Sequence, residues 1–241
     1  IELLGVRGSL PTPPAPAQQT QAFQRLIRGF LDSPFGREGD IDGFFETLPQ
    51  HIVGGYGGNT TCVSAATNQT RIIIDCGTGI RNCVDHFMKN GCAKGQGTVH
   101  ILMTHFHWDH LMGLPFFTPL FIAGNQVHFY AVQPDLEKNI RLLFQRPFFP
   151  VSFEMLQSKI FFHKLAERTP NKIEDFVVTP YQLDHPDPCW GFKIQAEGKT
   201  YAHCVDTEGT RKSRAELGPD LPLYQGVDLM VFDGQYSIEE A

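Results

Sequence analysis

The chain has 241 residues, of which 41% are hydrophobic and 19% charged, and its formal net charge is −6. This composition is typical of one large globular domain and excludes a disordered chain, and no apolar run approaches the ~20 residues of a membrane helix. The acidic balance argues against a binder of polymeric nucleic acid, because neutralising phosphates takes a basic surface.

The first part of the chain alternates short apolar runs with loops. A strand is predicted over residues 1–6, a proline-rich stretch over 11–16, a helix over 21–31 and a helix break over 36–43. The glycine-rich segment 54–61 is predicted to be a loop, since so much glycine disfavours the interior of a regular element. Strands over 62–66 and 71–75 follow, and a helix over 80–90 ends at Gly91.

The remainder contains more strands than helices. Strands are predicted over 99–103, 126–132, 159–165, 176–183, 191–195, 200–205 and 229–232, and a helix over 134–145. Many short strands with a few interspersed helices, and no internal repeat, indicate sheets packed between helices. Six scattered cysteines without a CxxC pair suit buried thiols, and the chain opens without a signal segment, so we expect a cytoplasmic protein without a membrane partner.

One motif directly after the predicted strand 99–103 dominates the chemistry. His105, His107, Asp109 and His110 fall within six residues. Alternate side chains of an extended segment share a face, so His105 and His107 can reach one ion together. A turn after Trp108 would then direct Asp109 and His110 at a second ion. Imidazole nitrogen with carboxylate oxygen suits zinc, and with more carboxylate also manganese or iron.

Two further residues complete a candidate ligand set. His185 follows one predicted strand and precedes a proline, and Asp206 ends another. A carboxylate at such a strand end can bridge two cations about 3.5–4 Å apart. His203 lies on the opposite face of its strand from Asp206, so we interpret it as a packing or surface residue. The other histidines have no ligand-like neighbour in the sequence and are interpreted as ordinary.

The motif H-x-H-x-D-H, a later lone histidine and a strand-terminal aspartate resemble the metallo-β-lactamase fold superfamily. More narrowly, the chain is similar to the branch that holds ribonuclease Z and small phosphodiesterases. The similar stretches include Val6–Ser9, Gly57–Thr60, Ile74–Gly79, Phe149–Val151 and Trp190–Phe192. The resemblance implies an α/β fold, a four-layer αββα sandwich with mixed sheets, in one domain over residues 1–241. It also implies that residues 11–54 are an insertion or lid and that C-terminal elements are missing.

The resemblance also assigns the ligands. The first of two divalent ions, zinc in preference to manganese or iron, would take His105, His107, His185 and Asp206. The second would take Asp109, His110 and Asp206, with one more histidine expected beyond Ala241. The implied enzyme is a dinuclear metal-dependent hydrolase in which a bridging hydroxide attacks the substrate, with Asp109 and Asp206 in the catalytic centre. A homodimer is compatible with the family.

We predict a small-molecule substrate, a phosphodiester of the small or cyclic nucleotide type. The alternatives are an acyl hydrolase of a lactam, lactone or thioester, and a non-catalytic metal-binding sensing module. Asp75 is predicted either to hold a ligating histidine or to close an ordinary turn.

Four residues are candidates for contact with the substrate. Asn59 and Thr60 would donate hydrogen bonds to it, unless their loop serves shape alone. Phe148 and Phe149 would stack on a base, unless they belong to the core. The basic segment Arg211–Arg214 is interpreted as a solvated loop, with phosphate binding as the alternative.

Overall fold

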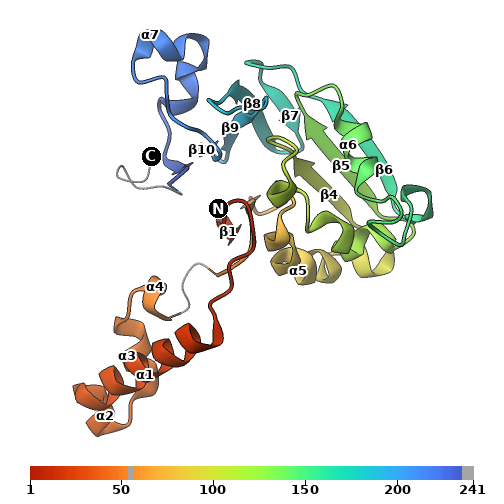
Figure 1. Ribbon diagram of the computed structural model, residues 1–241. Helices are drawn as coiled ribbons and strands as arrows, with labels where there is room; N and C mark the ends of the chain where they lie inside the picture. Colours follow the sequence, from red (N-terminus) through yellow and green to blue (C-terminus); the bar gives the residue numbers. More distant parts are fainter. Residues whose placement is uncertain (54–56, 235–241) are drawn as a thin grey trace.

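The computed structural model describes residues 1–53 and 57–234, and two sheets form its body (Figure 1). The first sheet has the order β1-β2-β3-β4-β5-β6, in which β1 to β3 are antiparallel neighbours and β3 to β6 are parallel. Its strands are β1 (Glu2–Gly5), β2 (Cys62–Ala66), β3 (Arg71–Ile74), β4 (Thr98–Leu102), β5 (Gln126–Ala131) and β6 (Lys159–Lys164).

The second sheet has the order β11-β10-β9-β8-β7 and is antiparallel except for the parallel pair β10 and β11. Its strands are β7 (Asn171–Ile173), β8 (Phe176–Gln182), β9 (Trp190–Ala196), β10 (Lys199–Cys204) and β11 (Leu229–Phe232). Both sheets are therefore mixed, as predicted. The hairpin between β9 and β10 turns at Glu197 and Gly198, which both have positive φ.

Helical segments cover the outer faces of the two sheets. Over the first sheet lie α5 (Val84–Lys89), α6 (Leu136–Leu142) and the 3₁₀ turns η1 (Thr78–Cys83), η2 (Cys92–Lys94), η3 (Trp108–His110), η4 (Leu114–Phe116), η5 (Thr118–Phe121) and η6 (Phe153–Met155). Over the second lies η7 (Gly218–Tyr224), which is contacted by the preceding α7 (Arg214–Leu217). The predicted four layers are present, with a thin outer layer on the second sheet. No helix in the described ranges is both long and apolar enough to cross a membrane.

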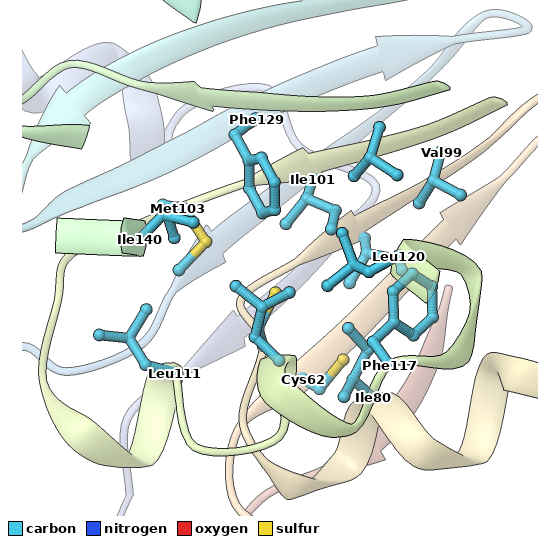
Figure 2. Packing of buried hydrophobic residues seen from close by; sticks show 14 of the residues in the cluster. Cys62, Ile80, Val99, Ile101, Met103, Leu111, Phe117, Leu120, Phe129 and Ile140 are labelled. Atoms are coloured by element: carbon cyan, nitrogen blue, oxygen red, sulfur yellow. The ribbon is translucent and has the colours of Figure 1, made fainter. Parts of the chain in front are cut away.

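A small apolar cluster joins η7 to the second sheet through residues such as Tyr181, Ala202 and Leu223, and two larger cores hold the other layers together. One lies between the first sheet and its helical cover, where Ile101, Phe129, Leu111, Phe117 and Ile140 pack against one another (Figure 2). The other lies between the sheets, where Ile72 and Leu102 meet Val178 and Phe192. Strand alternation explains both, because neighbouring residues such as Ile101 and Leu102 point to opposite faces. The six cysteines are all buried and free, as predicted.

Residues 16–53 form a helical arm that projects from the sheets (Figure 1). Its helices are α1 (Pro16–Asp32), α2 (Pro34–Glu38), α3 (Ile41–Thr47) and α4 (Gln50–Val53). Helix α1 has no buried residue, and Phe23, Ile27 and Leu31 are each more than half exposed. The lid role predicted for residues 11–54 remains a prediction.

Several predicted boundaries were wrong. The expected break at 36–43 instead contains α2 and the start of α3, where Ser33 and Asp40 cap the new helices through the amides of Gly36 and Gly43. The helix predicted over 80–90 begins as a 3₁₀ turn, and β7 was missed because three residues carry too little pattern. Part of the predicted loop 54–61, residues 54–56, lies outside the described residues.

Candidate metal centre

The predicted ligands come together where the strands end, although they span a hundred residues of sequence. His105, His107, His185 and Asp206 each offer one ligand atom, and these atoms all lie within 4.8 Å of one another. We call these four residues the first donor group. The Nδ1 atom of His107 is 3.2 Å from Nε2 of His185, and Nε2 of His105 is 3.6 Å from Oδ2 of Asp206.

A second donor group consists of Asp109, His110 and Asp206, whose ligand atoms also lie within 4.8 Å of one another. The Nε2 atom of His110 is 3.0 Å from Oδ2 of Asp206 and 3.7 Å from Oδ2 of Asp109. The backbone amide of Ser9, in the loop after β1, donates to Oδ2 of Asp109 at 2.8 Å. Asp206 belongs to both groups, which is the arrangement a bridging carboxylate requires.

Asp75 orients the second donor group from beneath. It follows β3 and is fully buried, and its carboxylate accepts hydrogen bonds from the Thr104 amide at 2.9 Å and the Thr104 hydroxyl at 2.8 Å. The same carboxylate lies 2.8 Å from Nδ1 of His110. Because Nδ1–H of His110 donates a hydrogen bond to Asp75, Nε2 of His110 is directed at Asp206. A carboxylate behind a ligating histidine fixes the ring and its tautomer in metal sites.

Asp187 has the corresponding position in the first donor group, and the sequence reasoning missed it. Its Oδ2 accepts a hydrogen bond from Nε2 of His107 at 2.8 Å, which leaves the Nδ1 lone pair of His107 facing His185. This hydrogen bond to His107 lowers the pKa of Asp187. The sequence contained a signal for Asp187, because this carboxylate lies two residues after the candidate ligand His185. A carboxylate there is close enough to support another histidine of the same metal site, here His107.

The backbone around both donor groups is held in an unfavourable region. Ser9, Asp75 and Asp206 have φ values of 60°, 60° and 56°. Such left-handed conformations are uncommon for residues other than glycine, and they cluster at functional sites where the surrounding structure enforces them. Gly77 adds a close approach, because a Cβ there would lie 2.3 Å from the Asp109 carbonyl oxygen.

The chemistry of the donors fits a divalent cation. Nε2 of His105 is buried and has no hydrogen-bond partner among the described residues, which is costly unless an ion occupies the position. Burial, followed by the nearby His110, lowers the pKa of His105 to about 3, so its ring is neutral and presents a lone pair. Ligands about 2.0–2.1 Å from a tetrahedral zinc ion lie roughly 3.3–3.4 Å apart. The 3.2 and 3.6 Å separations in the first donor group agree with that spacing.

For two other ligands, Asp206 and His110, the pKa shifts favour the charged form of the side chain. Burial raises the pKa of Asp206, but hydrogen bonding and charge from His110 outweigh burial and bring it to about 2. Burial lowers the pKa of His110, whereas Asp75 and then Asp206 raise it to about 10. Without a cation, His110 therefore carries a proton between two carboxylates. An ion bound there would replace that proton, as metal binding generally does.

The residues predicted to contact substrate separate into two kinds. Thr60 is fully buried, and its hydroxyl accepts the Thr78 amide while the Thr78 hydroxyl accepts the Thr60 amide. The Thr60 hydroxyl thus holds η1 against the start of β2, and a substrate contact by Thr60 remains a prediction. The carbonyl of Asn59 accepts the Val6 and Arg7 amides, and a contact by its side chain remains a prediction.

The two phenylalanines also differ from each other. Phe148 is 84% exposed, whereas Phe149 is partly buried against Phe116 and Phe144. The core interpretation therefore holds for Phe149 and is wrong for Phe148, and stacking on a substrate remains a prediction for both.

His203 is fully buried, and its Nδ1 lies 2.9 Å from the Tyr201 hydroxyl. The packing interpretation of His203 thus agrees with the structure.

Arg211, the first residue of the basic segment 211–214, is bound to carboxylates. It is therefore neither freely solvated nor available to bind phosphate. The guanidinium of Arg211 donates to Asp184 and, at 2.8 Å, to Asp220. Asp220 is 2% exposed and also accepts from Arg168 at 2.9 Å and from the Gln182 amide at 3.1 Å. These contacts hold the end of β8, and with it the position of neighbouring His185.

Comparisons with known proteins agree with this geometry. The family model described as "Beta-lactamase superfamily domain" matches residues 70–241. Ribonuclease Z of Staphylococcus carnosus (strain TM300) is 25% identical over 173 residues, covering 67% of this chain and 50% of that protein. Ribonuclease BN of Cronobacter sakazakii is 27% identical over 163 residues, covering 64% and 46%. The chain thus spans about half the length of the curated relatives that it matches.

Two solved structures are also similar. The metallo-beta-lactamase fold protein YhfI from Bacillus subtilis has a TM-score of 0.48 at 15% identity, covering 72% of this chain and 62% of that one. The short form of human tRNase Z has a TM-score of 0.45 at 19% identity, covering 71% and 69%. Since the family model matches more than half of the chain, and that match includes all six candidate ligands, this protein belongs to the beta-lactamase superfamily.

Proposed function

We propose that this chain is the hydrolytic part of a phosphodiesterase that uses two divalent metal ions, zinc in preference to manganese or iron. The observation that carries the proposal is the convergence of two donor groups on Asp206. When bound at such a pair of sites, divalent ions lower the pKa of coordinated water to about 7 and neutralise the charge on phosphate oxygens.

The protein's own contribution is to hold the donors in place before substrate arrives. Asp75 and Asp187 each accept a hydrogen bond from one ring nitrogen of a candidate ligand histidine, so the other ring nitrogen is available to a metal. The Ser9 amide restrains one oxygen of Asp109. A cavity of about 400 Å³ between the edges of β1 and β11 is lined by Asp206 and Arg7, and it leaves room beside the donors for a substrate.

A phosphodiester is preferred to an acyl substrate for two reasons. Two cations around one carboxylate can each contact an oxygen of a phosphodiester, whose two non-bridging oxygens share one negative charge. The curated relatives are named ribonuclease Z and ribonuclease BN, and RNA is itself a phosphodiester. The net charge of −6 favours a small substrate over a polymer, so we propose a small or cyclic nucleotide.

The test is a substrate panel with the purified, zinc- or manganese-loaded chain. We expect about two metal equivalents and turnover of bis(p-nitrophenyl) phosphate and of cyclic nucleotides, with no turnover of a chromogenic lactam or thioester. Preferential lactam or thioester hydrolysis would replace phosphodiester by acyl chemistry. One tightly bound ion without any turnover would favour a sensing module, and cleavage of RNA alone would overturn the small-substrate proposal.

A further inference from the structure

A cavity of about 440 Å³ lies beside the first donor group, and the metal chemistry does not explain it. His105, Phe106 and His107 line one side, residues 132–135 with Asn139 a second, and the β8–β9 loop with Trp190 a third. Its volume is within the range of ordinary small-molecule pockets, about 300–1,000 Å³. A substrate whose phosphate lies at the donors is therefore close enough to place its organic part in this cavity.

The lining is unsuited to phosphate. None of the described residues around the cavity is lysine or arginine, and two are carboxylates, Asp135 and Asp187. Sites for phosphate groups use cationic side chains or backbone amides, so this cavity suits a neutral group that carries hydrogen-bond donors. The apolar walls, Phe106, Pro188 and Trp190 among them, suit a flat ring.

Two further polar side chains at this cavity, the exposed Asp135 and the half-buried Asn139, have no partner within the described ranges, in addition to the buried atoms His105 Nε2, Gln133 Oε1 and Trp190 Nε1. Asp135 precedes α6 at its N-cap position, yet its carboxylate makes no capping hydrogen bond, and no ion pair or side-chain bond involves it. Asn139 lies one turn later, with its backbone amide donating to the Asp135 carbonyl at 2.9 Å, and its side-chain amide likewise makes no hydrogen bond. Residues four apart in a helix share a face, so the two groups line the same side of the cavity.

The opposite polar group is committed to structure. Nε2 of Gln133 donates to the Thr104 carbonyl and to the Pro188 carbonyl, both at 2.9 Å. These two bonds tie the segment after β5 to the metal-binding loop and to the β8–β9 loop. The cavity wall is therefore tied to the loops that carry the donor groups. Asp135 and Asn139 keep unused hydrogen-bonding capacity, as do the buried atoms Oε1 of Gln133 and Nε1 of Trp190.

We propose that this cavity binds an amino-bearing nucleobase of the substrate, such as cytosine or adenine. The Asp135 carboxylate accepts from the exocyclic amino group, and the Asn139 amide donates to the adjacent ring nitrogen. An alkylammonium group would satisfy Asp135 but would leave the Asn139 amide without an acceptor, so a base fits the pair better. This inference rests on the proposed function and names its substrate class.

Binding is tested first without metal and without turnover. The chain has two tryptophans, Trp108 and Trp190, and Trp108 is 66% exposed. The variant Trp108→Phe therefore leaves Trp190, in the cavity wall, as the sole tryptophan reporter. We expect cytidine 5′-monophosphate to quench its fluorescence at about tenfold lower concentration than uridine 5′-monophosphate, whose carbonyl replaces the amino group and faces the carboxylate unfavourably.

Two further variants of this reporter assign the preference to Asp135. Asp135→Asn should abolish or invert it, because an amide can donate to the uracil carbonyl. Glu137→Gln is the matched control, since this substitution also removes one negative charge close to Asp135. Glu137 pairs with Arg141 and does not line the cavity. Equal binding of both nucleotides, or equal effects of the two variants, would overturn the inference.

Turnover separates this inference from the proposed function. In the metal-loaded chain, cyclic cytidine monophosphate should be hydrolysed about tenfold faster than cyclic uridine monophosphate at low concentration. Asp135→Asn should remove this difference, whereas the control Glu137→Gln should keep it. Turnover of bis(p-nitrophenyl) phosphate without discrimination between bases overturns only the inference. No turnover of any phosphodiester overturns both. A preference for p-nitrophenyl phosphorylcholine that depends on Asp135 would identify an ammonium pocket and overturn the base assignment.

Discussion

The described residues contain two clusters of histidines, and only one of them brings carboxylates close enough to form a candidate metal site. In the candidate metal centre the imidazoles meet carboxylates: Asp206 lies within 3.6 Å of both His105 and His110. The second, which we call the inter-sheet cluster, consists of His100, His128 and His163 on the face of the first sheet that is turned toward the second. Its rings stack with centroids 5.1 and 5.2 Å apart.

Three ring nitrogens of the inter-sheet cluster are hydrogen-bonded without an ion. Nδ1 of His128 is 2.9 Å from Nε2 of His163, and Nδ1 of His100 is 3.0 Å from the Tyr130 hydroxyl. Its nearest acid is Glu174, an exposed residue with its carboxylate 3.7 Å from His100. Among the described residues, only the two donor groups bring three ligand atoms close together. Carboxylates and the groups that support them, rather than the number of histidines, therefore distinguish a candidate metal site from a packed cluster.

The largest effect is expected from Asp206→Asn, because this residue belongs to both donor groups. An amide oxygen is a weak ligand and carries no charge, so both ions should be lost and activity should fall to background. Metal analysis after gel filtration, with turnover of bis(p-nitrophenyl) phosphate, measures the effect. Glu208→Gln is the control, since Glu208 is an exposed acid two residues away that belongs to neither donor group. Retention of two ions by Asp206→Asn would remove Asp206 from the centre.

A smaller loss is expected from Asp75→Asn. The amide keeps the shape of the carboxylate but not its charge, so His110 loses the acceptor that directs Nε2 at Asp206. Losing a supporting carboxylate of this kind typically costs 10–100-fold in metal affinity. Competition with a fluorescent chelator should show that loss for one ion, with the first donor group less affected. If both ions weaken equally, Asp75 serves the fold of the whole loop rather than one ligand.

Asp187→Asn should have a weaker effect than Asp75→Asn. Its bond to His107 is equally short, at 2.8 Å, but Asp187 is 71% exposed in its side chain and water can replace it. We expect a loss of at most about tenfold in affinity for the first ion, the lower end of the range for such supports. The same chelator competition measures it, with Asp85→Asn, an exposed acid on α5, as the control. A larger loss than for Asp75→Asn would reverse the order of the two supports.

The contrast between the clusters also shows what the sequence alone revealed. His105, His107, Asp109 and His110 are neighbours in the chain, so their shared chemistry was visible in the motif. His185 and Asp206 were found because each follows a strand, and strand ends gather at one edge of a sheet. Most strands were likewise predicted from apolar alternation, whereas the mixed sheets were implied by the family resemblance.

The inter-sheet cluster was not visible in the sequence. It exists because the parallel register pairs His100 with His128 and places His163 opposite Tyr130. No single segment encodes that register, since it depends on the pairing of three strands. Asp187 and the Ser9 amide were missed for a related reason: each supports a ligand across a distant loop contact, and the Ser9 contact uses the backbone, which every residue type carries.

The smallest expected effect concerns the inter-sheet cluster and appears only in acid. Burial, and then His128, lower the pKa of His100 from 6.5 to about 4, with His163 acting in the same direction and Glu174 opposing them. The folded protein thus binds fewer protons here than the unfolded chain does. Stability from a neutral His100 is complete above pH 6.5, starts to fall below it, and is lost as pH falls through about 4.

Lowering the pKa of His100 from 6.5 to about 4 corresponds to roughly 3 kcal/mol in the free energy of unfolding. We expect urea unfolding of the metal-free chain to show part of this loss between pH 7 and pH 5. His100→Gln should be less stable at pH 7, because it loses the Tyr130 bond, but should lose less stability on acidification. His86→Gln removes an exposed histidine on α5 and should keep most of the wild-type pH dependence. An unchanged pH dependence in His100→Gln would mean that the inter-sheet cluster tolerates protonation, and that burial of its rings is less complete in solution than their packing indicates.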